Sequence, residues 1–327
     1  MQAIVLVGGE GTRLRPLTDS VPKPALTLVD RPFLAYMVEW LASHGVTEVV
    51  LACGFLPDVL RGALGEEEHE GTRLTYVVEP DRRGTAGAFR FAADELGDRL
   101  EDRFLALNGD VLCDLDLSAL LRVHEELGAQ ATLGLYPVED SAAFGLVECD
   151  AERSVLAFRE KTGEPVPGEI NAGTYVLERS VLDLIPPGRE VSIEREVFPR
   201  LVGDGLGALP LEGYWMDIGT PERYLQASWD ILEGRVKTRV EPTAPGMLVG
   251  ADTEIASGAR VGPRAVLAPG CRVGEGAELT GSVLLEGCTV GAGATVSDSI
   301  LAAGVEVAPG ATLAGAVIGE DGHVPAP

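Results

Sequence analysis

The feature that most constrains the fold is a six-residue period near the end of the chain. Branched aliphatic residues recur at this spacing, with Gly, Ala, Pro and charged residues between them, at Val249, Ile255, Val261, Leu267, Val273, Leu279 and Leu285. One aliphatic residue in six cannot form the apolar stripe of an amphipathic helix. The spacing is typical of a β-solenoid, in which aliphatic side chains point into a prism and small residues form its corners.

Further along, the repeat changes its length. Three similar triplets follow one another at a spacing of 17 residues, namely Ser282–Leu284, Ser299–Leu301 and Ala316–Ile318. A disordered tail rich in Gly and Ala is the alternative, but it would not keep an aliphatic period. At roughly 18 residues per coil, the sequence therefore predicts about four to five coils over residues 247–327.

The N-terminal part instead alternates strand-like and helix-like segments. Apolar runs at 3–7, 49–53, 74–79 and 104–107 predict buried strands, and helical patterns occupy 32–44, 86–96 and 117–127. This alternation predicts a parallel sheet with helices on both faces. Ligands bind at the carboxyl ends of the strands in such sheets, where Gly8, Glu79 and Asp110 fall.

From about residue 131 the pattern becomes mixed. Strand-like runs at 131–137, 145–148, 155–159 and 174–177 precede two predicted helices, the second with Thr220 as its N-cap and Pro221 at its first position. Residues 233–246 are polar, contain two prolines and predict a linker. We therefore expect a domain at 1–232, a linker at 233–246 and the solenoid at 247–327.

The charge of the chain limits its partners. A net charge of −25 argues against nucleic acid, which needs a basic footprint. Within residues 8–24, however, Arg13, Arg15 and Lys23 outnumber the two acidic residues, which suits a small anionic ligand. Because no apolar run is long enough to span a membrane and no secretory signal precedes the first strand, we expect a soluble, cytoplasmic protein without a membrane partner.

Cysteine and histidine offer no catalytic arrangement. The five cysteines form no Cys-x-x-Cys pair and are predicted to be reduced thiols rather than disulfides or zinc ligands. The four histidines are scattered, so no Ser-His or Cys-His pair can be argued from them.

The first strand runs into a glycine-rich loop, Gly8-Gly9-Glu10-Gly11-Thr12-Arg13. Glycines let the backbone approach phosphates closely, and the freed N–H groups can hold anionic oxygens. The loop fits neither a Walker motif nor G-x-G-x-x-G, and a tight structural turn is the alternative. Lysine is rare in this chain, so Lys23 and Lys161 are candidates for a compact point charge, with ordinary surface lysines as the alternative.

Together, the segment Gly8–Thr18 and Pro22-Lys23-Pro24 resemble the signature of the sugar nucleotidyltransferase family. Within it, the nearest resemblance is to mannose-1-phosphate guanylyltransferases with a hexapeptide-repeat tail, and it extends over essentially the whole chain. The resemblance implies a Rossmann-like α/β catalytic domain, a sugar-binding insertion and lid in its second half, and a left-handed parallel β-helix. The implied reaction joins a nucleoside triphosphate to a sugar 1-phosphate with Mg²⁺ and releases pyrophosphate.

The resemblance also assigns roles by position. The residues implied to hold the nucleotide phosphates are Gly8, Gly9, Gly11 and Thr12, with Arg13 neutralising the leaving pyrophosphate and Lys23 near the α-phosphorus. The implied sugar-phosphate contacts are Gly145, Glu160, Lys161 and Asn171. Thr162 stands where the family commonly has proline, a departure that bears on the placement of Lys161.

Two aspartates resemble the family's metal ligands, Asp110 in Asn108-Gly109-Asp110 and Asp217 in Trp215-Met216-Asp217. Two carboxylates facing several phosphate charges would repel the substrate, and a Mg²⁺ ion between them reverses the sign of the interaction. The alternative is that both aspartates belong to ordinary turns. For the reaction we expect a direct in-line displacement by the sugar phosphate, which needs no general base.

Glu79, Gly84 and Thr85 match the family's base-reading segment, where thymidylyl- and uridylyl-transferring relatives tend to have glutamine. A carboxylate only accepts hydrogen bonds, and guanine offers two adjacent donors, N1–H and the 2-amino group. This favours GTP, although an ordinary strand-end residue is the alternative for Glu79. Mannose 1-phosphate follows from the resemblance only, and glucose or heptose 1-phosphates are not separated from it.

Three other readings stay open. A glucose-1-phosphate thymidylyl- or uridylyltransferase would keep the same fold, and a non-catalytic regulatory paralogue would bind nucleotide-sugar without turnover. An acyltransferase would need a histidine between coils, but His323 is the one histidine in the repeat. We expect the β-helix to brace the catalytic domain or to form a homo-oligomer.

Overall fold

The computed structural model describes residues 1–142, 144–159, 163 and 165–326. Two predicted site residues, Glu160 and Lys161, lie outside the described residues. The chain divides into two compact units, the first made of Met1–Gly9 and Met37–Trp215 and the second of Glu10–Tyr36 and Met216–Pro327. The boundaries expected at residues 232 and 247 stay a prediction.

The first unit contains a mixed sheet of ten strands among the described residues. Its parallel part has the order β7 (Arg103–Asn108), β1 (Gln2–Leu6), β4 (Glu48–Cys53) and β6 (Thr72–Val78). This order confirms the parallel arrangement expected for the N-terminal strands. β12 (Gly168–Glu178), from the half expected to be mixed, runs antiparallel to β7. Antiparallel neighbours need only short connections, and the mixed second half of the domain supplies them without crossover helices.

The remaining strands of this sheet lie on either side of its parallel part. β10 (Leu146–Cys149) and β11 (Val155–Arg159) follow β12, and β5 (Glu68–His69) pairs with β6 at the other edge. β9 (Ala131–Val138) pairs with both β12 and β13 (Leu206–Pro210). The strands predicted at 131–137, 145–148, 155–159 and 174–177 are therefore present, the last as part of a longer strand.

Most helices lie where the apolar periodicity predicts them. α1 (Phe33–Ser43), α3 (Gly84–Leu96) and α4 (Leu117–Leu127) match the predicted segments, whereas α2 (Pro57–Leu64) was not predicted. α4 begins at its N-cap Asp116, which accepts a hydrogen bond from Ala119 N at 3.0 Å. The first of the two helices predicted after the strand-like runs is replaced by short 3-10 and π turns.

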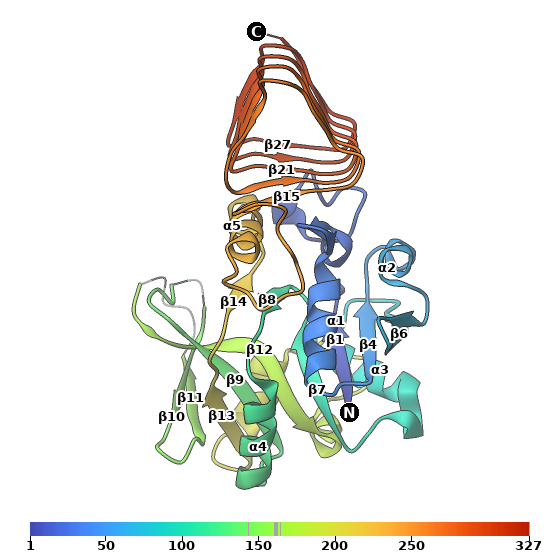
Figure 1. Cartoon of the computed structure of the whole chain (residues 1–327). Coiled ribbons are helices and arrows are strands. Elements are labelled where there is room, and N and C mark those ends of the chain that lie inside the picture. Colours follow the sequence, from blue (N-terminus) through green and yellow to red (C-terminus); the bar gives the residue numbers. More distant parts are fainter. Residues whose placement is uncertain (143, 160–162, 164, 327) are drawn as a thin grey trace. The chain divides into compact units, whose positions relative to one another are not determined.

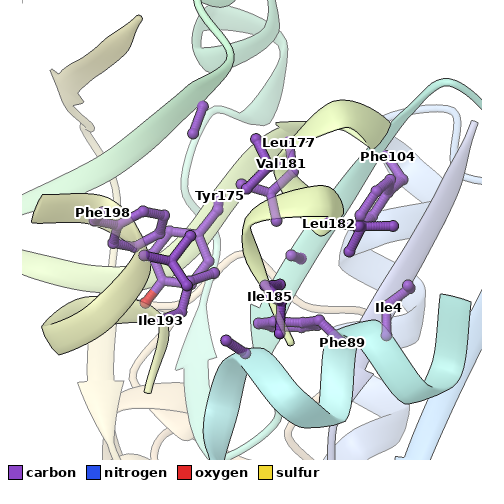
Figure 2. Packing of buried hydrophobic residues seen from close by; sticks show 14 of the residues in the cluster. Ile4, Phe89, Phe104, Tyr175, Leu177, Val181, Leu182, Ile185, Ile193 and Phe198 are labelled. Carbon is purple, nitrogen blue, oxygen red and sulfur yellow. The ribbon is translucent and has the colours of Figure 1, made fainter. Parts of the chain in front are cut away.

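The core of the first unit lies between the sheet and these helices and turns. Figure 2 shows Phe89 of α3 with Ile4 and Phe104 of the sheet, and Tyr175 beside Phe198. The rings of Tyr175 and Phe198 meet edge to face, with centroids 5.0 Å apart. Burying side chains of this size stabilises the fold by about 1.5–3 kcal/mol each.

The C-terminal part of the second unit is a β-helix of three parallel sheets, whose strands stack as a triangular prism in Figure 1. The first sheet has the order β15 (Met247–Val249), β18 (Ala265–Leu267), β21 (Val283–Leu284), β24 (Ile300–Leu301) and β27 (Val317–Ile318). The second runs β16 (Glu254–Ile255), β19 (Arg272–Val273), β22 (Thr289–Val290), β25 (Glu306–Val307) and β28 (His323–Val324). The third runs β17 (Arg260–Val261), β20 (Glu278–Thr280), β23 (Thr295–Ser297) and β26 (Thr312–Ala314). The predicted solenoid and its coil number are confirmed, and its left hand stays a prediction.

One position in the predicted period is wrong. Leu267 pairs with Leu284 rather than with Leu285, because the coils after the first contain 17 residues. At the shortened corner a buried serine forms hydrogen bonds with backbone groups. Ser282 Oγ donates to Thr280 O at 2.8 Å and accepts from Ser299 N at 3.1 Å. Ser299 repeats both bonds one coil later. Each triplet at 17-residue spacing therefore begins at a tight corner of the prism and continues into a strand of the first sheet.

The rest of the second unit packs around α5 (Pro221–Leu232) and the segment that follows it. The predicted cap is confirmed, since the Thr220 side chain accepts from Arg223 N. Arg264 of the first coil pairs with Glu233 at 2.7 Å and lies over the ring of Trp229, 5.0 Å from its centroid. Across the described residues, no helix is long and apolar enough to cross a membrane.

Candidate functional site

The described site residues fall into the two compact units, which are taken in turn. In the first unit, β1, β6 and β7 are parallel and end next to Gly8, Glu79 and Gly109. Glu79 N donates to Cys53 O at 2.8 Å, and Gly109 N donates to Leu6 O at 2.9 Å. These bonds extend the sheet into its loops. Gly8, Glu79 and Asp110 thus each follow a parallel strand at the carboxyl edge of the sheet, as expected, and their sharing of one site stays a prediction.

Two glycines differ in what they permit at this edge. A Cβ atom on Gly8 would lie 3.5 Å from Gly54 N and 3.9 Å from Glu79 Oε1, so Gly8 and the Glu79 carboxylate are neighbours. Gly9 is exposed, and a Cβ atom there would meet nothing within 4 Å. Packing therefore does not explain Gly9, and its predicted role at the nucleotide phosphates stays a prediction.

The Glu79 carboxylate is half-buried. Burial raises its pKa above the ordinary value of glutamate, and the positive charge of Arg83 opposes this shift. The Arg83 guanidinium lies over the Phe91 ring, 4.5 Å from its centroid. The face of the Phe91 ring therefore stabilises the Arg83 guanidinium. The positive charge of Arg83 in turn favours the ionised form of Glu79, which accepts hydrogen bonds.

Gly84 and Thr85 start α3 and pack against the segment around Val191. Gly84 has φ 66°, and a Cβ atom on it would lie 2.6 Å from Val191 O, so only glycine fits. The Thr85 hydroxyl donates to Glu194 Oε2 at 3.0 Å and accepts from Ile193 N at 2.8 Å. Both residues thus have structural roles here, and their predicted contact with the nucleotide stays a prediction.

A hydrogen-bond network connects Thr85 to Asn171 through residues that the sequence did not single out. Glu194 also accepts from Ser192 Oγ at 2.8 Å and from the Tyr175 hydroxyl at 3.5 Å. The same hydroxyl accepts from Asn171 Nδ2 at 2.8 Å. Glu194 therefore bonds Thr85 at the start of α3 directly, and it reaches Asn171, a predicted sugar-phosphate residue, through the Tyr175 hydroxyl. No local motif marks it, because the network forms only in the folded chain.

Asp110 follows a glycine that the packing requires. A Cβ atom on Gly109 would lie 2.6 Å from Leu6 O. The Asp110 side chain is exposed, and its charge helps to raise the pKa of Tyr175, after burial and the charge of Glu194. Asp110 is therefore within electrostatic reach of the phenol that bonds Asn171.

Three aromatic rings flank the bulge of β12 that follows Asn171. Trp215 stacks on Tyr136 with centroids 5.5 Å apart and meets Phe144 edge to face at 5.6 Å. Its Nε1 donates to Ala172 O at 2.9 Å, which fixes the indole on the bulge. Gly145, a predicted sugar-phosphate residue, is half-buried directly after Phe144.

In the second unit, the glycine-rich loop folds back on itself. Gly11 has φ 63°, and a Cβ atom on it would lie 3.1 Å from Thr18 Cγ2 and 3.2 Å from Lys23 Cβ. Thr18 Oγ donates to Gly11 O at 2.9 Å. This closure leaves the side chains of Thr12 and Arg13 exposed.

The closed loop brings two predicted site residues together. Lys23 is buried, and its Nζ lies 3.7 Å from Asp217 Oδ1. That oxygen is itself buried and has no hydrogen-bond partner within the described part of the chain. Arg13 lies beside the segment that follows Asp217, since a Cβ atom on Gly219 would lie 2.7 Å from Arg13 Nη2. The second unit thus gathers Gly11, Lys23, Asp217 and Arg13, whereas the sharing of one metal by Asp110 and Asp217 stays a prediction.

Comparison with protein families covers nearly the whole chain. Residues 2–234 match the family "Nucleotidyl transferase", and residues 243–326 match "GMPPB C-terminal domain".

Individual relatives agree with the family match. A mannose-1-phosphate guanylyltransferase of Mycobacterium tuberculosis is 44% identical over 237 residues, which cover 72% of this chain and 65% of that protein. A mannose-1-phosphate guanyltransferase of Schizosaccharomyces pombe is 41% identical over 249 residues, which cover 75% of this chain and 68% of that protein. The matched region thus spans about two thirds of these relatives.

Among solved structures, HddC from Yersinia pseudotuberculosis superimposes with a TM-score of 0.62 at 27% identity. The match covers 70% of this chain and 99% of HddC. HddC complexed with GMP-PN gives a TM-score of 0.61. These likenesses agree with the fold of residues 2–234.

Proposed function

Because this chain belongs to the nucleotidyl transferase family, we propose that it transfers the guanylyl group of GTP to mannose 1-phosphate, giving GDP-mannose and pyrophosphate. The names of the two relatives support this activity, and the complex of HddC with GMP-PN supports a guanine nucleotide. The observation that carries the proposal is the buried pair of Lys23 and Asp217 beside Gly11, at the loop that resembles the family signature.

The chemistry of this pair fits a bound cation. Members of the family generally use Mg²⁺. Asp217 Oδ1 is buried and lacks a hydrogen-bond partner among the described residues, and a carboxylate oxygen in that state is a ligand that Mg²⁺ accepts. We propose that Asp217 and Asp110 hold the ion. When bound, Mg²⁺ supplies positive charge for the phosphate oxygens of the substrate.

The protein's own side chains then align the reactants. A phosphate oxygen of the sugar phosphate forms a bond to the α-phosphorus, the bond from that phosphorus to the bridging oxygen breaks, and its electron pair leaves with pyrophosphate. The attacking oxygen is already an anion, so no side chain has to remove a proton. Lys23 and Arg13 stabilise the charge that develops on the phosphate oxygens.

Base choice is assigned to Glu79. Its carboxylate accepts from two adjacent donors of guanine, and such charge-assisted bonds contribute about 1.5–3 kcal/mol each. Burial raises the pKa of Glu79, and the charge of Arg83 opposes this rise and so favours the ionised form. Cytosine and uracil do not present the same pair of donors, which gives the preference for GTP.

For the sugar phosphate we propose Asn171 and Gly145, with Glu160 and Lys161 outside the described residues. The rings of Trp215, Tyr136 and Phe144 flank these positions and offer flat apolar faces to a sugar ring. We also propose that the protein is a soluble cytoplasmic enzyme, and that it forms a homo-oligomer through the β-helix, whose end coils expose strand edges.

The test is pyrophosphate release by the purified full chain. The protein is incubated with Mg²⁺, mannose 1-phosphate and each of GTP, dTTP, UTP, CTP and ATP, with glucose 1-phosphate in parallel. We expect the fastest release from GTP with mannose 1-phosphate, and none without Mg²⁺ or without the sugar phosphate. Faster release from dTTP or UTP with glucose 1-phosphate would refute the substrate assignment. Folded protein that releases pyrophosphate from no pair would instead be a regulatory paralogue.

A further inference from the structure

A second group of metal-ligating side chains lies in the first unit and includes none of the residues assigned above. It consists of Glu39 on α1, His69 at the end of β5 and Glu70 in the turn that follows. One potential ligand atom from each residue lies within 4.8 Å of the other two. Helix α1 and the β5–β6 hairpin are separate in sequence, so these three side chains come together only in the folded chain.

The hydrogen bond of His69 determines which ring nitrogen is available. Nδ1 lies 3.1 Å from Leu64 O, near the C-terminal end of α2. A carbonyl oxygen only accepts, so Nδ1 carries a proton, and in the neutral imidazole Nε2 then carries the lone pair. Nε2 is buried and has no hydrogen-bond partner in the described part of the chain. A buried lone pair of this kind is unfavourable unless a donor or a cation meets it.

This arrangement is the one that metal-binding histidines adopt. Such a histidine donates its other ring N–H to a carboxylate or a backbone carbonyl, which fixes the tautomer and the ring orientation. In this chain Leu64 O receives that bond.

The turn positions Glu70 at a conformational cost. His69 pairs with Thr72, so Glu70 and Gly71 form a two-residue hairpin turn with φ values of 47° and 86°. Asn and Gly are preferred where both central residues have positive φ, and Glu is not. The carboxylate therefore occupies a position at which turn geometry alone would favour Asn.

We propose that Glu39, His69 Nε2 and Glu70 bind a divalent transition-metal ion of the Zn²⁺ class, with water completing the coordination. A mixed set of one imidazole and two carboxylates suits zinc, whereas Mg²⁺ prefers oxygen ligands only. With bonds of about 2.1 Å, two ligands on a tetrahedral zinc ion lie roughly 3.4 Å apart, so small side-chain rotations close the site. Three protein ligands leave one position open, as in an exchangeable site. The bound ion connects α1 to the β5–β6 hairpin.

The site is tested by titrating the nucleotide-free full chain with Zn²⁺ in competition with a colorimetric chelator. Without nucleotide, the outcome does not depend on the proposed transferase activity. We expect one Zn²⁺ per chain, and a melting temperature that rises with Zn²⁺ concentration, because a ligand that binds only the folded state stabilises it. Mg²⁺ at the same concentrations should not reproduce the rise.

The decisive variant is Glu70→Asn, which removes the carboxylate and supplies the residue that the turn prefers. The metal-free variant should melt at or above the temperature of the unmodified protein, while its Zn²⁺ dissociation constant rises at least about tenfold. His69→Asn should lose the same binding. Glu67→Gln removes one charge from an exposed position in the same acidic stretch and should bind Zn²⁺ normally. Equal Zn²⁺ affinity of Glu70→Asn and the unmodified chain, or no Zn²⁺ binding by the latter, would overturn the proposal.

Discussion

The sheet of the first unit and the β-helix of the second bury aliphatic side chains by different rules. Strands β1, β4, β6 and β7 differ in sequence, and each can end in a different polar residue, such as Glu79 after β6. The β-helix repeats one geometry, and its buried polar side chains among the described residues are Ser282 and Ser299, which bond the next coil.

This difference indicates which region of the molecule can hold a catalytic site. A sheet of unlike strands gathers unlike groups at one edge, whereas a repeat places the same kind of side chain at every coil. We therefore assign function to the strand ends and the glycine-rich loop, and a scaffold role to the β-helix. Substitutions in the two regions should separate loss of activity from loss of stability.

The largest expected effect is on activity and follows from Asp110→Asn. Removing a proposed Mg²⁺ ligand should lower kcat by about a thousandfold or more, equivalent to roughly 4 kcal/mol of transition-state stabilisation. The melting temperature should stay unchanged, because the side chain is exposed. Pyrophosphate release and thermal unfolding measure the two quantities. Asp98→Asn, also exposed, is the matched control, and retention of most of the activity by Asp110→Asn would refute the metal assignment.

Next in size is the effect of Leu284→Ala on stability. Leu284 is fully buried in the prism, so the truncation should lower the free energy of unfolding by about 2–5 kcal/mol while kcat changes little. Leu285→Ala is the control, since the neighbouring leucine is only partly buried and should cost clearly less. Urea unfolding measures both. A larger loss in Leu285→Ala would restore the strict six-residue period and contradict the 17-residue coil.

A smaller effect, on specificity, is expected for Glu79→Gln. Loss of the charge-assisted bonds to guanine should reduce the ratio of kcat/KM for GTP to that for dTTP about ten- to a hundredfold, or roughly 1.5–3 kcal/mol. The comparison uses both nucleotides at saturating mannose 1-phosphate. An unchanged ratio would show that base choice resides elsewhere in the site.

The pH dependence of GTP use tests the same carboxylate. Burial raises the pKa of Glu79, so the accepting form is lost at a higher pH than for an ordinary glutamate as pH falls. The ratio of kcat/KM for GTP to that for dTTP should therefore decline on acidification in the unmodified enzyme and stay flat in Glu79→Gln. Arg83→Met should shift the decline to higher pH, because the Arg83 charge lowers this pKa. A shift to lower pH would contradict the assignment.

The smallest expected effect concerns the serine corners of the β-helix. Ser282→Ala leaves Ser299 N without its acceptor and should cost about 1–3 kcal/mol of unfolding free energy, with kcat unchanged. Ser297→Ala, on a half-buried strand position, is the control for removing a hydroxyl. Equal losses in the two variants would remove the special role of the corners.

How far the sequence could predict these features depends on whether the signal is local. Some features depend only on residues close together in the sequence, and the structure confirms them. They are the aliphatic repeat of the solenoid, the cap at Thr220 and the helix at 117–127. Leu284 and Leu285 are adjacent and chemically identical, so a period count cannot tell which points inward. The helix α2 and the β5–β6 hairpin are short elements and were missed.

For the candidate site, sequence reasoning found residues but not their partners. The glycine-rich loop and Lys23 stand out by composition, whereas the contact of Lys23 with Asp217 joins distant segments. Glu194 has no local motif, yet it bonds Thr85, Ser192 and Tyr175. Such tertiary contacts depend on how distant strands and loops pack together. The sequence pattern of a single segment carries no information about that packing.

In the proposed mechanism, alignment of the reactants and stabilising charge carry the transfer, with no covalent nucleophile on the protein. The most direct test uses one diastereomer of GTP with sulfur on the α-phosphorus, together with mannose 1-phosphate, and determines the configuration of the product by ³¹P NMR. A single in-line displacement predicts inversion at phosphorus. Retention would require two displacements through a group on the protein and would contradict the account.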